Sequence, residues 1–177
     1  MKAIFLDRDG VINKKMPEHD HVKSWNEFSF LPDSKEALKN LAGLDYVIII
    51  ITNQRAIKEG TLTINGLALI HKKMKTEIKE AGGRIDAVYY CPHGYNECEC
   101  RKPGSELFLK AQEKFNLNFN GSWMIGDSKT DIEAGQRLGL KTIFLKKDYN
   151  QIPVPTPDYI LNNLSEVAEL IKQDGQK

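Results

Sequence analysis

Two aspartates two residues apart follow a short apolar run near the start of the chain. The run is Ala3-Ile4-Phe5-Leu6, and the motif behind it is Asp7-Arg8-Asp9-Gly10. A strand places alternate side chains on one side, so Asp7 and Asp9 begin on the same side, and Gly10 allows the chain to turn. Two carboxylates this close repel each other unless a cation lies between them or one keeps its proton. The motif therefore suits a magnesium site, or a nucleophile beside a general acid; a solvated turn is the alternative.

Three more groups of polar residues follow along the chain. Thr52-Asn53-Gln54 offers a hydroxyl, amides and backbone N–H groups, which can hold phosphate oxygens without adding charge. Arg101-Lys102 supplies two cations, of which arginine suits bidentate recognition of an oxyanion and lysine provides a compact charge. Asp127 can complete a magnesium site, with Ser128 or Asp131 supporting it. Taken alone, each group is also explained as a polar turn, a solvated surface pair or a helix cap.

The cysteines form a separate cluster with one histidine. All three lie within ten positions, and the cluster is Cys91, His93, Cys98 and Cys100. Three thiolates and an imidazole suit a closed, structural zinc site with no position left for a catalytic water. Zinc would stabilise a loop with little core of its own and direct the adjacent Arg101-Lys102 toward the other polar groups. Free thiols beside an unrelated histidine are the alternative, and an iron–sulfur centre fits the spacing less well.

The apolar periodicity predicts alternating strands and helices as the scaffold for these groups. Strands are expected over residues 2–6, 46–51, 87–90, 122–125, 142–145 and 159–160. Helices are expected over residues 34–41, 64–81, 106–115, 131–138 and 164–171. Residues 11–32 form the longest stretch without clear periodicity, which is typical of a functional loop.

Such alternation predicts an open, mostly parallel α/β sheet with helices on both faces. Ligands bind sheets of this kind at the carboxyl ends of the strands. Asp7, Thr52, Cys91 and Asp127 are each expected directly after a strand. Their convergence at one edge of the sheet favours a single site over four unrelated turns.

The composition is that of an ordinary globular protein. The 177 residues are 41% hydrophobic and 28% charged, with a net charge of +1, and they suffice for one domain with a real core. The absence of a basic block argues against nucleic acid or an anionic membrane as partner, and the longest apolar run, residues 47–51, is too short to span a bilayer. The start of the chain has no signal-peptide pattern, and the clustered thiols suit a reducing compartment, so the cytoplasm is expected. The sequence does not determine an oligomeric state, and a monomer is compatible with it.

The four motifs resemble, in order and spacing, those of the haloacid dehalogenase (HAD) superfamily of phosphohydrolases. They are Asp7-Arg8-Asp9-Gly10-Val11-Ile12-Asn13, Ile51-Thr52-Asn53-Gln54, Cys98-Glu99-Cys100-Arg101-Lys102-Pro103 and Ile125-Gly126-Asp127-Ser128-Lys129-Thr130-Asp131. The resemblance is to the capless zinc-loop branch that contains heptose 1,7-bisphosphate 7-phosphatases and histidinol-phosphate phosphatases. It covers nearly the whole chain and implies a Rossmann-like three-layer fold. It also implies a single phosphatase domain over residues 1–177, with no large cap and a zinc loop at about residues 91–103.

The resemblance implies a magnesium-dependent phosphatase of small phosphorylated metabolites that acts through an aspartyl-phosphate. Asp7 would be the nucleophile, and Asp9 would act first as general acid and then as general base. Asp7, the backbone carbonyl of Asp9, and Asp127 would hold magnesium. Thr52 and Lys102 would stabilise the transferring phosphoryl group. These roles agree with the needs of phosphoryl transfer, which are mainly positioning and charge neutralisation.

The resemblance leaves the substrate less defined than the reaction. The substrate-binding residues it implies are Asn53, Gln54, Arg55, Arg101 and Lys102. Arg55 stands where the heptose enzymes have a small hydroxyl residue, and it either adds an anion contact or points to solvent. Residues 14–25 lack a segment that contacts substrate in those enzymes. The first expectation is removal of the 7-phosphate of D-glycero-D-manno-heptose 1,7-bisphosphate; histidinol phosphate or general sugar phosphates are the alternatives.

Two other functions are compatible with parts of the sequence, and three histidines lie outside the motifs. A catalytically silent, zinc-stabilised binding module is a function of a different class, and the presence of Asp7, Asp9, Lys102 and Asp127 argues against it. A macromolecular phosphate end would fit an open site, but the chain has no basic patch to support one. The remaining histidines are expected at the surface or as capping residues: His19, His21 and His71.

Overall fold

The computed structural model describes residues 1–17 and 20–175 of the chain, and His19 therefore lies outside the described residues. Six strands form one sheet in the order β3-β2-β1-β4-β5-β6, and every neighbouring pair is parallel. The strands are β1 (Ala3–Leu6), β2 (Val47–Asn53), β3 (Ala87–Cys91), β4 (Trp123–Gly126), β5 (Lys141–Leu145) and β6 (Tyr159–Leu161). The helices are α1 (Ser34–Ala42), α2 (Ile64–Glu80), α3 (Glu106–Phe115), α4 (Lys129–Arg137) and α5 (Leu164–Asp174). The expected α/β class with a parallel sheet is confirmed.

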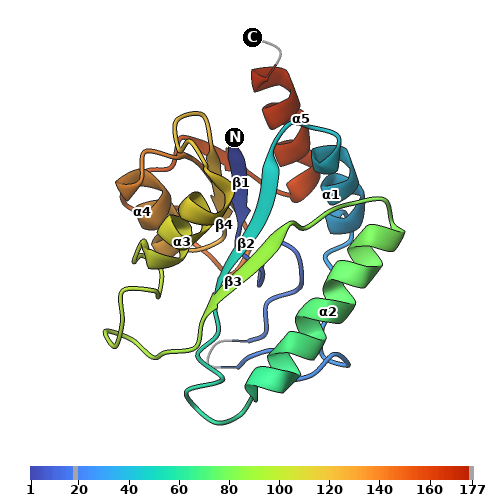
Figure 1. The fold of residues 1–177 in the computed structure, drawn as a ribbon, viewed down its shortest axis with the longest axis vertical. Coiled ribbons are helices and arrows are strands. Elements are labelled where there is room, and N and C mark those ends of the chain that lie inside the picture. The colour runs from blue at the N-terminus through green and yellow to red at the C-terminus, as the bar shows by residue number, and fades with distance from the viewer. Residues whose placement is uncertain (18–19, 176–177) are drawn as a thin grey trace.

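The helices cover both faces of the sheet and make three layers (Figure 1). Alternate residues of the central strand β1 enter different cores, as the period of two requires. Ile4 and Leu6 pack with apolar residues of α1, α2 and α5, whereas Ala3 and Phe5 pack with those of α3 and α4. Because β1 and most of β2 are buried on both faces, their sequences are continuous apolar runs.

Some strand ends differ from the prediction. β2 and β3 run further than their hydropathy indicated, so Thr52 and Cys91 lie inside strands and not directly after them. The reason is the parallel ladder, which pairs Thr52 with Tyr90 and Asn53 with Cys91 even though the β2 residues are polar. Asp7 and Asp127 do follow their strands directly.

The predicted helices are all present, with shifts at their ends. α4 begins at Lys129 and not at Asp131, because Ser128 is its N-cap and Asp131 completes a capping box. α5 continues to Asp174, past the predicted end at residue 171. No helix in the described part of the chain combines the length and apolarity needed to cross a bilayer.

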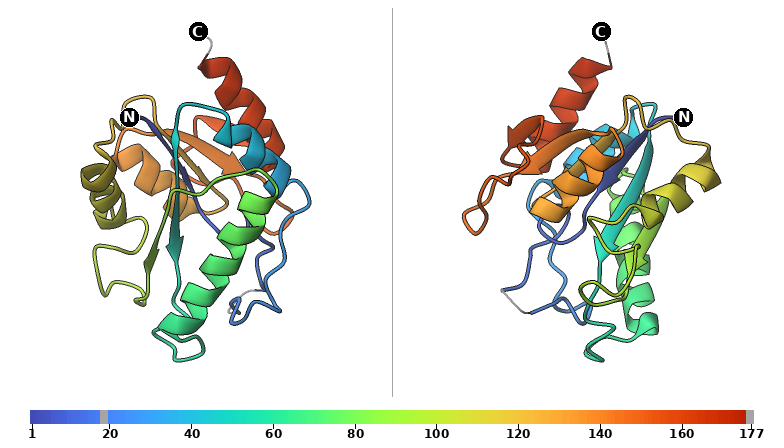
Figure 2. Two further views of the ribbon diagram at one scale, coloured as in Figure 1. Left: turned by 45° about the vertical axis from the view of Figure 1, so that its right-hand side comes forward. Right: turned by 90° about the vertical axis from the view of Figure 1, so that its left-hand side faces the viewer.

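The loops that follow the strands emerge at one end of the molecule. In Figure 2 the segment after β1 and the loop between β3 and α3 extend from the end of the sheet opposite the N-terminus. This is the carboxyl edge of the parallel strands, where the polar motifs were predicted to lie. The scaffold therefore gathers segments that are far apart in the chain.

Candidate active site

Three carboxylates meet at the carboxyl edge of β1 and β4. One oxygen each from Asp7, Asp127 and Asp131 lies within 4.8 Å of the others. Gly10, with φ of +89°, makes this approach possible, since a Cβ there would lie 2.2 Å from Asp127 Oδ2. The predicted pair of Asp7 and Asp127 is thus brought together, and the structure adds Asp131, which the sequence had given only a supporting place.

The carboxylate cluster fits a divalent cation. Burial, with the charges of Asp131 and Asp127, raises the pKa of Asp7 to about 7 against the opposing effect of Lys102. Burial also raises the pKa of Asp127. Asp127 Oδ1 is buried and has no hydrogen-bond partner among the described residues, so it has lone pairs free for a ligand. Clustered carboxylate oxygens whose pKa values are raised by burial match the oxygen ligands that Mg²⁺ prefers.

Lys102 is the cation that the protein itself supplies to the cluster. Its side chain is 2% exposed, and its Nζ lies 2.9 Å from Asp7 Oδ1 and 2.7 Å from Asp131 Oδ1. Nζ also donates to the carbonyl of Ile51 at 2.6 Å. Burial alone would lower the pKa of Lys102, but the two carboxylates outweigh it and raise it, so the amine stays charged. Lys102 thus lies beside Asp7, the residue that the family resemblance assigns as nucleophile.

Asn53 holds the backbone of Lys102 in place. Its Oδ1 accepts from the Lys102 N–H at 3.0 Å, and its Nδ2 donates to the Lys102 carbonyl at 3.2 Å. The neighbouring Thr52 is buried, and its hydroxyl oxygen accepts a hydrogen bond from Gln54 Nε2 at 2.9 Å. The side chains that the sequence assigned to the phosphate therefore also join β2 to the segment that carries Lys102.

Asp9 lies beside the cluster in a dense set of hydrogen bonds. Its carboxylate accepts from Arg8 Nη2 at 2.9 Å, Asn13 Nδ2 at 2.8 Å and Gln54 Nε2 at 2.9 Å. Burial would raise the pKa of Asp9, but the charge of Arg8 and these hydrogen bonds outweigh burial and lower it. Asp9 is therefore an oriented carboxylate, while Asp7 is the poorly compensated one.

The cysteine cluster is formed as predicted. The donor atoms of Cys91, His93, Cys98 and Cys100 all lie within 4.8 Å of one another, and adjacent pairs are 3.0–3.7 Å apart. Burial and the neighbouring thiols raise the pKa of Cys100, so a cation is needed to hold the thiolate form. The three soft sulfurs and one imidazole fit a four-coordinate zinc ion.

A cavity of about 1140 Å³ opens above the carboxylates. Asp7, Asp9, Asp127 and Lys102 lie in its wall, and the loops after β1, β2 and β3 form its rim. Two arginines stand over one exposed aromatic ring at this rim. The Arg101 guanidinium carbon is 4.4 Å and that of Arg55 is 5.0 Å from the centre of the Tyr95 ring. The cavity thus offers cations at its mouth and a cluster of carboxylates at its base.

Arg55 is neither free in solvent nor fully available to an anion. Its Nε lies 2.7 Å from Glu59 Oε1, and the other oxygen of Glu59 lies 3.3 Å from His21 Nε2. His21 is half-buried in this network, so its expected place at the surface or as a cap is corrected. A sequence argument could not pair His21 with Glu59, because the two belong to different loops.

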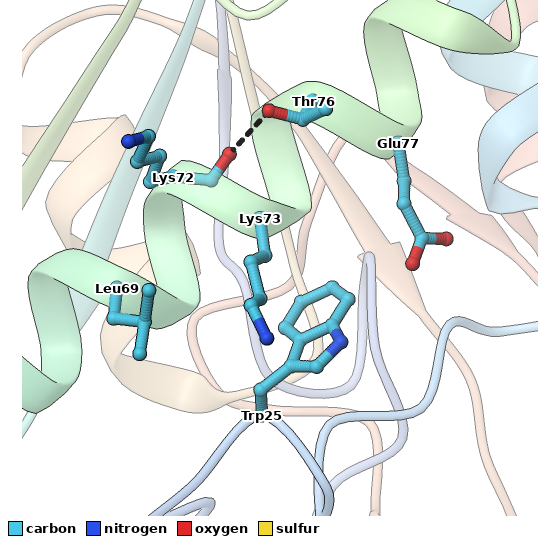
Figure 3. Close-up of a pocket in the computed structure, with 6 residues that line it drawn as sticks. All are labelled: Trp25, Leu69, Lys72, Lys73, Thr76 and Glu77. Carbon is cyan, nitrogen blue, oxygen red and sulfur yellow. Dashed lines mark hydrogen bonds between the residues drawn. The ribbon is translucent and has the colours of Figure 1, made fainter.

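A second, smaller pocket of about 290 Å³ lies where Trp25 approaches α2 (Figure 3). Lys73 directs its amine toward the Trp25 ring, with 5.8 Å between Nζ and the ring centre. Thr76 donates to the backbone carbonyl of Lys72 within the same helix at 3.0 Å. Of these contacts, the one between Lys73 and Trp25 joins the segment after β1 to α2.

His71 is also corrected, because it is buried. Its ring lies on α2 at 8% exposure, and its Nε2 is 3.2 Å from Nη1 of the fully buried Arg8. Arg8 had no predicted role, although an arginine just beyond a buried central strand needs a buried partner. The position of Arg8 just after the buried strand was therefore the sequence signal for a buried partner such as His71.

Two further residues contact Asp127 and were missed. Lys15 Nζ and Tyr149 Oη each lie 2.9 Å from Asp127 Oδ2. They come from the loops after β1 and β5, two stretches without periodicity. No local pattern in the sequence marks either residue as a neighbour of Asp127.

Comparison with known proteins identifies the family. A family model described as HAD-hydrolase-like matches residues 99–167. The D-glycero-beta-D-manno-heptose-1,7-bisphosphate 7-phosphatase of Pasteurella multocida is 33% identical over 97% of both chains. The D-glycero-alpha-D-manno-heptose-1,7-bisphosphate 7-phosphatase of Photorhabdus laumondii is 34% identical, also over 97% of both chains. The crystal structure of the D,D-heptose 1,7-bisphosphate phosphatase from B. bronchiseptica, complexed with magnesium and phosphate, superposes with a TM-score of 0.88 at 31% identity, covering 98% of this chain and 99% of that one. This chain therefore belongs to the family of HAD-like phosphatases that contains these heptose-bisphosphate phosphatases.

Proposed function

We propose that this protein removes the 7-phosphate of D-glycero-D-manno-heptose 1,7-bisphosphate, with Asp7 as the nucleophile. The observation that carries the proposal is the carboxylate cluster with its buried lysine at the base of the cavity, in a chain similar over its full length to phosphatases of that substrate. An ionised carboxylate that attacks phosphorus splits one displacement into two easier ones. The carboxylate would take the phosphoryl group and later lose it to water.

Asp9 would serve both halves of this reaction. The first half needs a protonated Asp9, which would give its proton to the departing alcohol, and the second needs the carboxylate, which would take a proton from water. The hydrogen bonds from Arg8, Asn13 and Gln54 favour the carboxylate. The negative charge of an approaching phosphate favours the protonated form, because a like charge raises the pKa of a nearby carboxyl.

The negative charge on the transferring phosphoryl group would be neutralised from two sides. Lys102 lies against Asp7 and would contact the phosphoryl oxygens, with Thr52 nearby on β2. Asp7 and Asp127, with the backbone carbonyl of Asp9, would hold Mg²⁺, and Asp131 would orient Lys102. When bound, the metal supplies further neutralisation of phosphoryl charge.

Recognition of the rest of the substrate would fall to the rim. The cavity volume suits a small phosphorylated sugar. A second phosphate of the substrate would meet the guanidinium groups of Arg101 and Arg55, which are suited to bidentate contact with phosphate. We also place the protein in the cytoplasm, because its three thiols are free and suited to zinc in a reducing compartment. A single phosphatase unit over residues 1–177 is supported by the relatives that match 97% of the chain.

The test is steady-state release of phosphate with magnesium from three substrates at matched concentrations: both anomers of heptose 1,7-bisphosphate, and histidinol phosphate. We expect kcat/KM to be highest for one of the two heptose anomers. A preference for histidinol phosphate would overturn the substrate assignment and leave the chemistry at Asp7 intact. Weak and similar rates on all three would reject both substrates.

A further inference from the structure

Arg8 stands between the two catalytic aspartates but projects into a different layer of the protein. Ile4 and Leu6 face the core formed with α1, α2 and α5, and Arg8 continues that alternation beyond the end of β1. Its side chain is completely buried. A buried guanidinium is stable only when its N–H groups are satisfied, so its partners are informative.

The guanidinium of Arg8 joins Asp9 to a histidine on α2. Nη2 lies 2.9 Å from both oxygens of Asp9, and Nε lies 3.3 Å from Oδ1. On its other side, Nη1 lies 3.2 Å from Nε2 of His71. Arginine has no acceptor, so His71 Nε2 must accept this hydrogen bond and the ring proton must be on Nδ1.

His71 is suited to remain a neutral acceptor. Burial first, and the charge of Arg8 second, lower its pKa to about 3. The groups that face it are Arg8 and Asp9 at the end of β1, and Tyr90 on β3 at 6.2 Å between ring centres. A neutral ring can accept a hydrogen bond from the guanidinium and leaves the positive charge of Arg8 to pair with Asp9.

We propose that His71 is a positioning residue for the reaction. It fixes the plane of the Arg8 guanidinium, and that plane fixes the direction of the Asp9 carboxylate. The inference rests on the role given to Asp9 under the proposed function. Asn13 and Gln54 hold the same carboxylate from other sides, so removal of His71 loosens Asp9 without detaching it.

Misdirection of Asp9 has a chemical signature that general destabilisation lacks. The departing alcohol of a sugar phosphate needs a proton, whereas nitrophenolate is a stable leaving group and needs little help. The value of kcat/KM reports the steps up to departure of that group. A loosened Asp9 therefore slows sugar phosphates more than 4-nitrophenyl phosphate, and a smaller folded fraction slows both equally.

The experiment compares His71→Met, which removes the acceptor at similar volume, with His71→Gln, which retains one. The control is Met74→Ala, which opens a cavity in the buried face of α2 and leaves the acceptor of His71 in place. The readout is the ratio of kcat/KM for heptose 1,7-bisphosphate to that for 4-nitrophenyl phosphate. We expect this ratio to fall about 10-fold or more in His71→Met. In His71→Gln and Met74→Ala it should stay within about 2-fold of wild type.

An unchanged ratio in His71→Met would overturn the proposal, as would an equal fall in His71→Gln. If His71→Met does not fold, His71→Asn takes its place. Asparagine is one methylene group shorter than glutamine, so its acceptor lies further from Arg8 and the ratio should still fall. An unchanged ratio in His71→Asn would overturn the proposal too. If the wild type hydrolyses 4-nitrophenyl phosphate but not the heptose substrate, the substrate assignment fails. The His71 ratio is then measured with another primary alkyl phosphate that the wild type hydrolyses.

Discussion

At the scale of single residues, the environment of a side chain separates two aspartates that look alike in the sequence. Asp7 has its pKa raised to about 7 by burial and by neighbouring carboxylates. Asp9 has its pKa lowered, because Arg8 and two amides outweigh burial. Without ligands these shifts run opposite to the proposed tasks, since a nucleophile must be ionised and a general acid protonated. A cation between Asp7 and Asp127 would lower the pKa of Asp7, and a phosphate beside Asp9 would raise that of Asp9.

His71 should make the protein less stable in mild acid. Its pKa is about 3 in the folded chain against an ordinary value of 6.5, so between these values the unfolded chain binds a proton that the folded chain does not. Stability is therefore full above pH 6.5 and falls as the pH is lowered toward 3. Between pH 7 and pH 5 this costs about 2 kcal/mol.

The measurement is urea denaturation of the wild type and His71→Gln at pH 7 and pH 5. The wild type should lose about 2 kcal/mol more free energy of unfolding than the variant over this interval. Equal losses would mean that the folded state protonates His71 as readily as the unfolded state does.

Arg55 should contribute to binding of a second phosphate and little to chemistry. Its guanidinium lines the cavity, and a hydrogen bond to a charged group contributes about 1.5–3 kcal/mol. Arg55→Ala is expected to raise KM for a bisphosphate about 10-fold or more, with kcat nearly unchanged. Lys58→Ala is the matched control, since Lys58 pairs with Glu97. If KM for a monophosphate rose equally, Arg55 would have a different role.

At the scale of elements, the zinc loop and β2 together position Lys102. The loop carries its ligands from the end of β3 to Cys100, and Lys102 follows two residues later. Asn53 of β2 holds the backbone of Lys102 from the other side through two hydrogen bonds. The loop thus helps to set the position of Lys102 beside Asp7.

Loss of zinc should lower both stability and turnover. We expect Cys98→Ser, or removal of zinc by a chelator followed by return of magnesium, to lower the melting temperature by at least about 5 °C, because the loop loses its main constraint. The midpoint is measured by differential scanning calorimetry, and kcat should fall with it as Lys102 loses its position. A zinc-free protein with unchanged stability would contradict a structural role.

The elements show what a sequence can and cannot reveal. Every strand and helix was predictable from the apolar pattern, because all except the exposed edge strand β6 bury a face that must be apolar. The ends of β2 and β3 were not, since polar residues such as Thr52 and Asn53 continue the ladder. The site motifs were predictable because each follows or ends a strand. Lys15, Tyr149 and His71 were not, because they reach Asp127 or Arg8 from segments far away in the chain.

At the scale of the whole molecule, the parallel sheet brings four sequence segments to one edge. Carboxylates from β1 and β4 meet a lysine from the zinc loop at the base of a single cavity. The arginines lie at its rim, so a bisphosphate would have one phosphate at each end of the site. Relatives of similar identity are named for opposite anomers, so overall similarity does not assign an anomer to this chain.

The most direct test of the central claim is to trap the phosphoryl group on the enzyme. The protein is mixed with magnesium and heptose 1,7-bisphosphate, quenched in acid within milliseconds, digested and analysed by mass spectrometry. We predict one phosphoryl group on the peptide that contains Asp7, and none in Asp7→Asn, whose turnover should fall at least about 1,000-fold. Phosphate release without a phosphorylated peptide, or a phosphoryl group on another residue, would contradict the account.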